Sequence, residues 1–126
     1  MQRAIGIAAA ALGASAVILG AFGAHALQGR LDEAALHVWH TAVEYQFWHA
    51  LALLAVGGLS PVRGTRLLRA CAVAFCVGTA LFCGSLYALA FGAPHWLGAI
   101  TPLGGLSLIV GWVLLGAAFW CSAASK

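Results

Sequence analysis

Four long apolar stretches alternate along the chain with short polar or turn-forming segments. The apolar stretches cover residues 4–24, 39–59, 70–91 and 97–120. A helix needs about 20 apolar residues to cross a hydrocarbon core about 30 Å thick. The stretches are continuously apolar and do not alternate with a period of two, which indicates helices and not membrane strands. The pattern therefore predicts a single all-α domain over residues 1–126, an integral membrane bundle of four transmembrane helices.

The composition narrows the class of protein further. Hydrophobic residues make up 63% of the chain and charged residues 7%, and the mean hydropathy is +1.00. A soluble domain typically carries about 25% charged residues, because its surface must be hydrated. The scarcity of charge excludes a soluble enzyme and a disordered chain. The net charge of +3 is too small for a groove that follows phosphates, so we expect no nucleic-acid partner.

The distribution of basic residues predicts an orientation. Four spans place both termini and the middle loop on one side of the membrane. That side carries five of the six basic residues, namely Arg3, Arg63, Arg66, Arg69 and Lys126, whereas the other carries Arg30. Because cytoplasmic loops are enriched in Lys and Arg, both termini are predicted to be cytoplasmic. Arg63, Arg66 and Arg69 are also suited to anionic headgroups, which makes membrane lipids expected partners.

The N-terminal stretch has a second interpretation as a signal peptide. Ala24-His25-Ala26 follows the apolar run in the manner of a cleavage site. The run is longer than the roughly 7–15 residues of a signal h-region. We therefore expect a retained first span.

Glycines recur at intervals of seven residues on three of the predicted helices. They are Gly6, Gly13 and Gly20 on the first, Gly78 with Ser85 and Gly92 on the third, and Gly104 and Gly111 on the fourth. Small residues let membrane helices approach closely, and a sevenfold repeat keeps one side of a helix towards one partner. These glycines are predicted to pack helices, either within one chain or between copies. We expect a homo-oligomer or a subunit of a larger membrane complex.

Polar side chains gather in the outer half of the predicted bundle, where Glu44 is the one acidic residue within a span. Polar groups within a membrane need protein partners and are functional candidates. Thr101-Pro102, near Gly104 and Gly105, predicts a kink in the fourth helix. We predict a polar pocket between the second, third and fourth helices, opening outward. Its candidate residues are His25, His40, Glu44, Tyr45, His49, Ser85, Tyr87 and Thr101.

The sequence is compatible with three uses of this pocket. The favoured one is a hydrogen-bond network in a non-catalytic structural or accessory membrane protein. The second is a channel or carrier for protons, ions or a small solute around Glu44. The third is a transition-metal site of His40, Glu44 and His49, because imidazole and carboxylate suit such metals. The sequence holds no catalytic triad, phosphate-binding loop or dinucleotide fingerprint, so we expect neither an enzyme nor a cofactor.

Several segments resemble a known family. They are GAFGAHAL at residues 20–27, WHTAVEYQ at 39–46, HALAL at 49–53, GSLY at 84–87, and LGAITPLGG at 97–105 with Gly111 and Trp112 beyond it. In these segments the chain resembles the YgdD/YwdK-like family of small inner-membrane proteins, a domain-of-unknown-function family with a eukaryotic transmembrane branch. Cys83 departs from the serine more often found there in the family. The resemblance implies a four-span protein of the bacterial inner membrane and supplies no reaction, substrate or cofactor.

Overall fold

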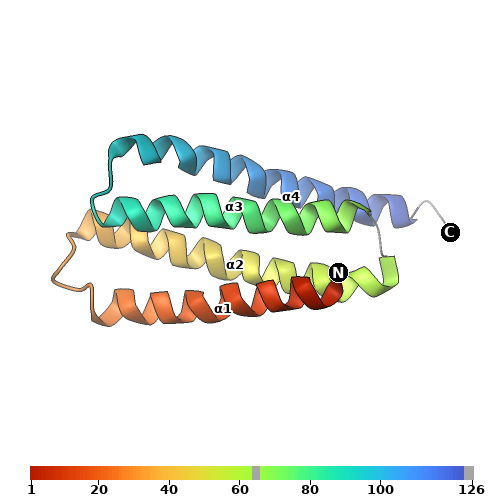
Figure 1. Ribbon diagram of the computed structural model, residues 1–126, viewed down its shortest axis with the longest axis horizontal. Helices are drawn as coiled ribbons and strands as arrows, with labels where there is room; N and C mark the ends of the chain where they lie inside the picture. Colours follow the sequence, from red (N-terminus) through yellow and green to blue (C-terminus); the bar gives the residue numbers. More distant parts are fainter. Residues whose placement is uncertain (64–65, 124–126) are drawn as a thin grey trace.

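The computed structural model describes the backbone of residues 1–63 and 66–123, and their side chains except those of residues 60–63 and 122–123 (Figure 1). These residues form four long helices: α1 (Gln2–His25), α2 (Glu33–Arg63), α3 (Arg66–Ala90) and α4 (Ile100–Ala123). A short 3₁₀-helix, η1 (His95–Ala99), precedes α4. The four predicted helices are confirmed, and α2 begins six residues before the predicted stretch at 39.

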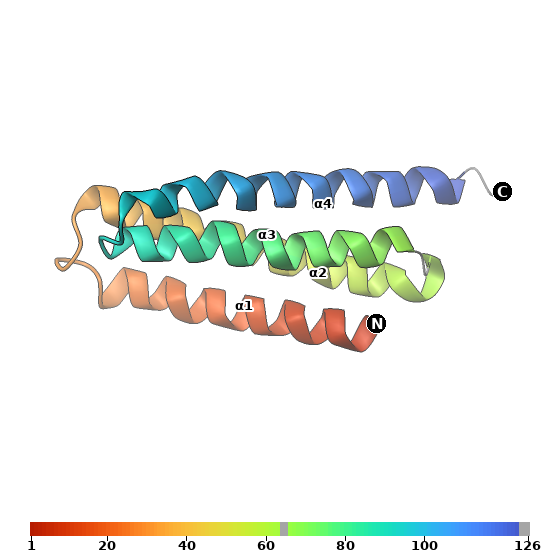
Figure 2. The same ribbon diagram turned by 45° about the horizontal axis from the view of Figure 1, so that its top comes forward.

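The helices run up and down in chain order, and α2 and α3 lie between α1 and α4 in both views (Figures 1 and 2). α1 packs mainly on α2 and α4 mainly on α3, and the two hairpins join where α2 packs on α3. The start of α1, the end of α2, the start of α3 and the end of α4 lie together at one end. We call this the arginine end, because Arg66 and Arg69 begin α3 there. The other end holds the α1–α2 and α3–α4 connections.

Local signals explain where the helices begin and end. The Ala26 N–H donates to the Phe22 carbonyl at 2.8 Å and closes α1. Gly29 then takes a φ of +78°, a left-handed conformation that costs glycine little. The Asp32 carboxylate accepts from the Ala35 N–H at 2.8 Å and caps the start of α2. Gly92, with a φ of +80°, makes the corresponding turn after α3.

The predicted kink near Thr101-Pro102 is wrong in position. α4 runs without interruption from Ile100, and the irregular segment is η1, which ends at Ala99. Pro102 therefore lies in the first turn of α4. A proline there removes an N–H that has no partner within the helix, so it does not bend the helix.

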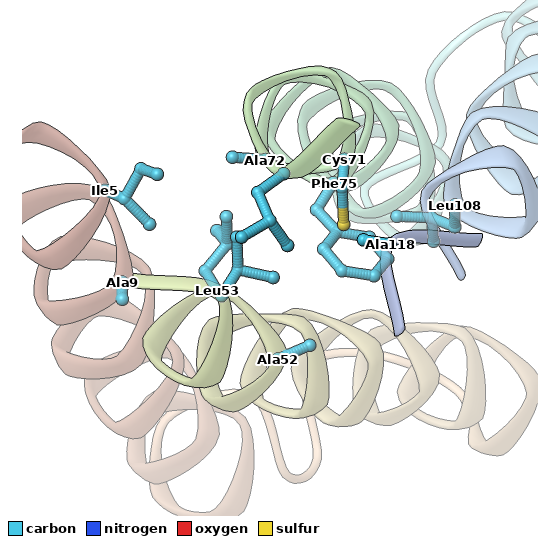
Figure 3. Close-up of a cluster of buried hydrophobic side chains, with 11 residues drawn as sticks. Ile5, Ala9, Ala52, Leu53, Cys71, Ala72, Phe75, Leu108 and Ala118 are labelled. Carbon is cyan, nitrogen blue, oxygen red and sulfur yellow. The ribbon is translucent and has the colours of Figure 1, made fainter. Parts of the chain in front are cut away.

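The core lies mainly in the half of the bundle towards the arginine end. Figure 3 shows side chains from all four helices pointing inward around Leu53 and Phe75, both 0% exposed. A smaller cluster of Leu27, Trp39 and Ala90 closes the opposite end. The bundle thus has its larger hydrophobic cluster at one end and a smaller one around Trp39 at the other, and Gln46 and His49 of α2 lie between them.

Glycines set the distance between α3 and α4. A Cβ on Gly78 would lie 2.9 Å from the Leu108 backbone nitrogen, and one on Gly104 would collide with the backbone of Phe82. Gly111 faces the Phe75 ring in the same way. On α1, Gly13 and Gly20 face α2 at 3.8 and 3.3 Å, and a Cβ on Gly23 would collide with the Trp39 ring, whereas Gly6 has no neighbour within 4 Å of an added Cβ. The predicted packing role thus fits α3 and α4 best, and Gly6 lies outside it.

Three of the described helical segments are long and apolar enough to cross a membrane by length and composition. They are Gln2–His25, Arg66–Ala90 and His95–Cys121. Their outward surfaces carry large apolar side chains such as Ile18 and Val113, which are 67% and 66% exposed. Such surfaces are unfavourable in water and suited to lipid. α2 is not among these segments, so a second span at 39–59 remains a prediction.

Candidate functional site

A hydrogen-bond network centred on Gln46 joins three helices. Gln46 is 5% exposed, and its Nε2 donates to the Leu12 carbonyl at 3.0 Å and to Ser15 Oγ at 2.7 Å, both on α1. The Tyr87 hydroxyl on α3 donates to Gln46 Oε1 at 2.9 Å. Both amide hydrogens and the amide oxygen thus have protein partners. The network ties both α1 and α3 to the inner side of α2.

His49 forms a second connection, between α2 and α4. Its Nδ1 lies 2.7 Å from the Tyr45 carbonyl, and the Trp112 indole N–H donates to its Nε2 at 3.2 Å. A carbonyl only accepts and an indole N–H only donates, so the ring is a neutral imidazole with its proton on Nδ1. The Phe75 ring packs against its edge with centroids 5.4 Å apart. Both nitrogens of His49 are therefore occupied.

Smaller polar pairs join neighbouring helices. Ser85 Oγ donates to the Phe82 carbonyl and lies 2.7 Å from Thr101 Oγ1, which makes Thr101 the donor between the two hydroxyls. Ser107 on α4 donates to the Ala74 carbonyl on α3 at 2.9 Å. The Trp39 indole donates to the Leu19 carbonyl on α1 at 2.9 Å. These bonds connect the two helices of each hairpin, α1 to α2 and α3 to α4.

Glu44 lies on the opposite side of α2 from Gln46. Two residues correspond to about 200° around a helix, so the Glu44 side chain points away from the bundle. Glu44, His40 and His37 are all exposed, and Thr41 beside them is half-buried. The Thr41 hydroxyl donates to the His37 carbonyl of its own helix. We call the surface formed by His37, His40, Thr41 and Glu44 the outer polar face of α2.

The structure divides the predicted pocket into separate groups. Tyr45, His49, Ser85, Tyr87 and Thr101 contribute to contacts between helices, whereas His40 and Glu44 lie on the outer polar face. His25 is exposed at the end of α1. The proposed ligands His40, Glu44 and His49 are not brought together, and no group of three His, Cys, Asp or Glu side chains in the described part of the chain could hold a metal ion.

Sequence reasoning missed the residue at the centre of the network. Gln46 lies on the same side of α2 as the buried residues Trp39, Ala42 and Leu53. This common phase was a usable signal that Gln46 faces the interior. Trp112 and Ser15 were missed for a different reason, because their roles depend on how α4 and α1 dock on α2. Among the predicted lipid-headgroup residues, Arg66 and Arg69 are exposed, and the Arg63 side chain lies outside those described.

The fold and its interior define a helical membrane protein whose buried polar side chains join its helices. Comparison with known proteins gives the family: the profile described as "Protein of unknown function (DUF423)" matches residues 19–105. The chain belongs to this family, and the resemblance noted in the sequence is confirmed.

The relatives are named as membrane proteins. The chain is 44% identical over 101 residues to UPF0382 membrane protein YwdK of Bacillus subtilis, covering 79% of this chain and 82% of the relative. It is 45% identical over 96 residues to the UPF0382 membrane protein SH2409 of Staphylococcus haemolyticus, covering 76% and 78%. For a UPF0382 membrane protein of Haemophilus influenzae, the identity is 44% over 99 residues, covering 79% of each chain. No solved structure matches the chain significantly. With its apolar helices, the chain is a membrane protein.

Proposed function

We propose that this protein is a non-catalytic structural component of the bacterial inner membrane, which assembles with copies of itself through the outer polar face of α2. One observation carries the proposal: Glu44 and His40 face outward from α2, while Gln46 and His49 are paired inside the bundle. The polar groups available for a further interaction therefore lie on the surface of the single chain and not in a cavity within it.

The proposal includes four spans with both termini in the cytoplasm. α2 lies between α1 and α3 along the bundle, so a membrane that contains those two apolar helices also contains α2 (Figure 1). The start of α1 and the end of α4 lie at the arginine end, and the bias of Lys and Arg towards cytoplasmic loops favours the cytoplasm for that end. The three relatives come from bacteria, which favours the bacterial inner (plasma) membrane.

Glu44 then lies within the hydrocarbon region. α2 has 31 residues and is about 46 Å long at about 1.5 Å per residue. A core of about 30 Å centred on α2 begins about 8 Å from Glu33, and Glu44 lies about 8 Å further in. A charged side chain at membrane depth costs up to about 2.5–3.5 kcal/mol when lipid surrounds it. A protein partner removes most of this cost by supplying hydrogen bonds.

A second copy is the partner that the face itself favours. His37, Thr41, Glu44, Trp48, Leu51, Ala55 and Gly58 follow one another at alternating spacings of four and three, the pattern of a coiled-coil contact. His40 lies next to this stripe, so two copies related by a two-fold axis along the membrane normal place Glu44 of one copy beside His40 or Thr41 of the other. The small Ala55 and Gly58 allow close approach towards the arginine end.

A transport path around Glu44 is less well supported. The titratable groups of the outer polar face extend from His37 to Glu44 and then stop. Trp48, Leu51 and Ala55 continue the stripe as an apolar surface towards the arginine end. A path for protons or ions needs polar groups or water across the whole hydrocarbon core. The stripe therefore favours assembly over conduction. A metal site would itself require the dimer, because one copy places His40 and Glu44 but not His49 on this face.

The test compares two carboxylates on α2. Native mass spectrometry and crosslinking of protein in mild detergent are expected to show dimers or larger assemblies for the wild type. Glu44→Leu is expected to weaken association about 5- to 30-fold, the effect of about 1–2 kcal/mol for a polar contact between membrane helices. Glu33→Leu, in the first turn of α2 near the membrane surface, is the control and is expected to leave association unchanged.

Several results would overturn the proposal. A wild-type protein that is monomeric throughout, or a Glu44→Leu variant that associates as well as the wild type, excludes assembly through this face. In liposomes, proton or ion flux that depends on Glu44 would replace the structural function with transport. Stoichiometric bound metal lost in His40→Ala would replace it with metal binding.

A further inference from the structure

Two apolar grooves follow α3 at the arginine end of the bundle. The first, of about 470 Å³, lies between α1 and α3 and includes Ala4 and Ala72 in its lining. The second, of about 460 Å³, lies between α3 and α4 and includes Ala70 and Val110. Arg69 lines both grooves. The two grooves therefore begin at one basic side chain.

A ridge on α3 separates the grooves. Arg69, Val73 and Val77 line both of them and are spaced by four residues, so they stand above one another on one side of the helix. Val73 is 57% exposed and Val77 is 46% exposed. The ridge extends about 12 Å from Arg69 to Val77 at about 1.5 Å per residue. This length is close to one leaflet, which is half of a hydrocarbon core of about 30 Å.

The arginines beside the grooves have no acidic side chain near them. The chain holds three acidic residues. Asp32 and Glu33 lie at the opposite end of α2, and Glu44 lies about 28 Å from the Arg63 end at about 1.5 Å per residue. The first turn of α3 also contains no acidic residue, so its N-terminal N–H groups add to the positive potential. Arg66 and Arg69 are both exposed.

We propose that α3 binds one anionic diacyl phospholipid from the leaflet at the arginine end. The phosphate accepts hydrogen bonds from the guanidinium groups of Arg66 and Arg69, whose planar donors match phosphate oxygens. One acyl chain lies in the groove against α1, and the other lies in the groove against α4. The Val73–Val77 ridge separates the two chains. The lipid thereby contacts three of the four helices and lies on the opposite side of the bundle from the outer polar face of α2.

The test measures lipid retention by the full-length chain. Native mass spectrometry is performed after incubation with phosphatidylglycerol or with zwitterionic phosphatidylethanolamine. The wild type is expected to retain one phosphatidylglycerol in preference to phosphatidylethanolamine. The double variant Arg66→Gln/Arg69→Gln is expected to retain phosphatidylglycerol about 10- to 30-fold more weakly, from about 1 kcal/mol per basic residue near the surface. Arg30→Gln removes a charge at the other end and is expected to have no effect.

A second variant tests the grooves independently of the charges. Ala4 is exposed and lines the groove between α1 and α3, so Ala4→Phe fills that groove and leaves both arginines in place. Ala4→Phe is expected to weaken the binding of phosphatidylglycerol but not the binding of its single-chain lyso form. Equal retention of phosphatidylglycerol and phosphatidylethanolamine by the wild type contradicts the proposal. Unchanged phosphatidylglycerol binding in Ala4→Phe contradicts the placement of one chain in each groove. Circular dichroism checks that each variant remains helical.

Discussion

Individual polar residues determine how the bundle is held together, because lipid offers them no hydrogen bonds. Gln46 and His49 occupy neighbouring positions on the inner side of α2: Gln46 connects α1 and α3 to it, and His49 connects α4. Thr79 on α3 differs from them. It is 2% exposed, and its hydroxyl has no hydrogen-bond partner in the described part of the chain. Loss of the paired polar groups of Gln46 and His49 is therefore expected to lower stability, whereas loss of the Thr79 hydroxyl is not.

Replacement of Gln46 by leucine is expected to lower the free energy of unfolding by about 1–2 kcal/mol. The change removes the hydrogen bonds to α1 and α3, each of which averages about 0.6 kcal/mol in membrane proteins. Tyr87→Phe removes one of these bonds and is expected to cost about 0.6 kcal/mol. In a double-mutant cycle, measured by unfolding in detergent, the two changes are expected to be non-additive. Strict additivity would show that the Tyr87–Gln46 bond does not stabilise the bundle.

Replacement of Thr79 by valine is expected to leave stability unchanged or to raise it by up to about 1–2 kcal/mol. Valine has nearly the same shape and removes a buried hydroxyl that has no described partner. Thermal unfolding in the same detergent measures the effect. A clear loss of stability would show that the Thr79 hydroxyl does form a stabilising hydrogen bond.

The sequence revealed which residues are polar but not which of them pair. Glu44 is the one acidic residue within a predicted span, and its polarity alone predicts a place in an interior pocket. On α2, Glu44 instead points outward and Gln46 points inward. The sequence already indicates this, because Gln46 shares one side of the helix with the apolar residues Trp39, Ala42 and Leu53. The partners Leu12 and Ser15 could not be predicted, because they depend on the vertical register between α1 and α2.

At the scale of the helices, glycines allow close approach in both hairpins: Gly104 and Gly111 between α3 and α4, and Gly23 beside Trp39 between α1 and α2. Of the glycines in the sevenfold repeat, Gly104 lies against Phe82 of α3 and Gly111 lies against Phe75. An added Cβ on Gly6 would meet nothing within 4 Å, although the Gly6 backbone nitrogen lies 3.9 Å from the position of a Cβ on Gly57 of α2. Spacing identifies a stripe on one helix, whereas contact also requires that the stripe face the neighbouring helix. The predicted kink at Pro102 failed for a related reason, since the effect of proline depends on where the helix begins.

Two glycines on α4 provide a matched test of this packing. Gly104→Ala is expected to destabilise the bundle by about 1–3 kcal/mol, because the new methyl group collides with the backbone of Phe82 and forces α3 and α4 apart. Gly116 has no neighbour within 4 Å of an added Cβ. Gly116→Ala is expected to be neutral or to stabilise by about 0.5–1 kcal/mol. Thermal unfolding of both variants decides the matter, and equal effects would contradict close packing at Gly104.

At the scale of the whole molecule, the two central helices present different outward surfaces. α3 exposes apolar side chains such as Val73, Val77 and Leu81. α2 exposes His37, His40 and Glu44. One surface suits lipid and the other does not, because a carboxylate within the hydrocarbon region needs a partner. The central claim is therefore that the outer polar face of α2 is covered by a second copy in the membrane.

Disulfide crosslinking in native membranes tests this claim most directly. The native cysteines that are not fully buried, Cys76 and Cys121, are first replaced by serine. Cysteine is then introduced at Ala55, on the α2 stripe, or at Val73, on the outward side of α3. Both positions are exposed and lie about 10–12 Å from the arginine end at about 1.5 Å per residue. Oxidation is expected to yield disulfide-linked dimers for Ala55→Cys and not for Val73→Cys. Crosslinking at Val73→Cys alone, or at neither position, would contradict assembly through α2.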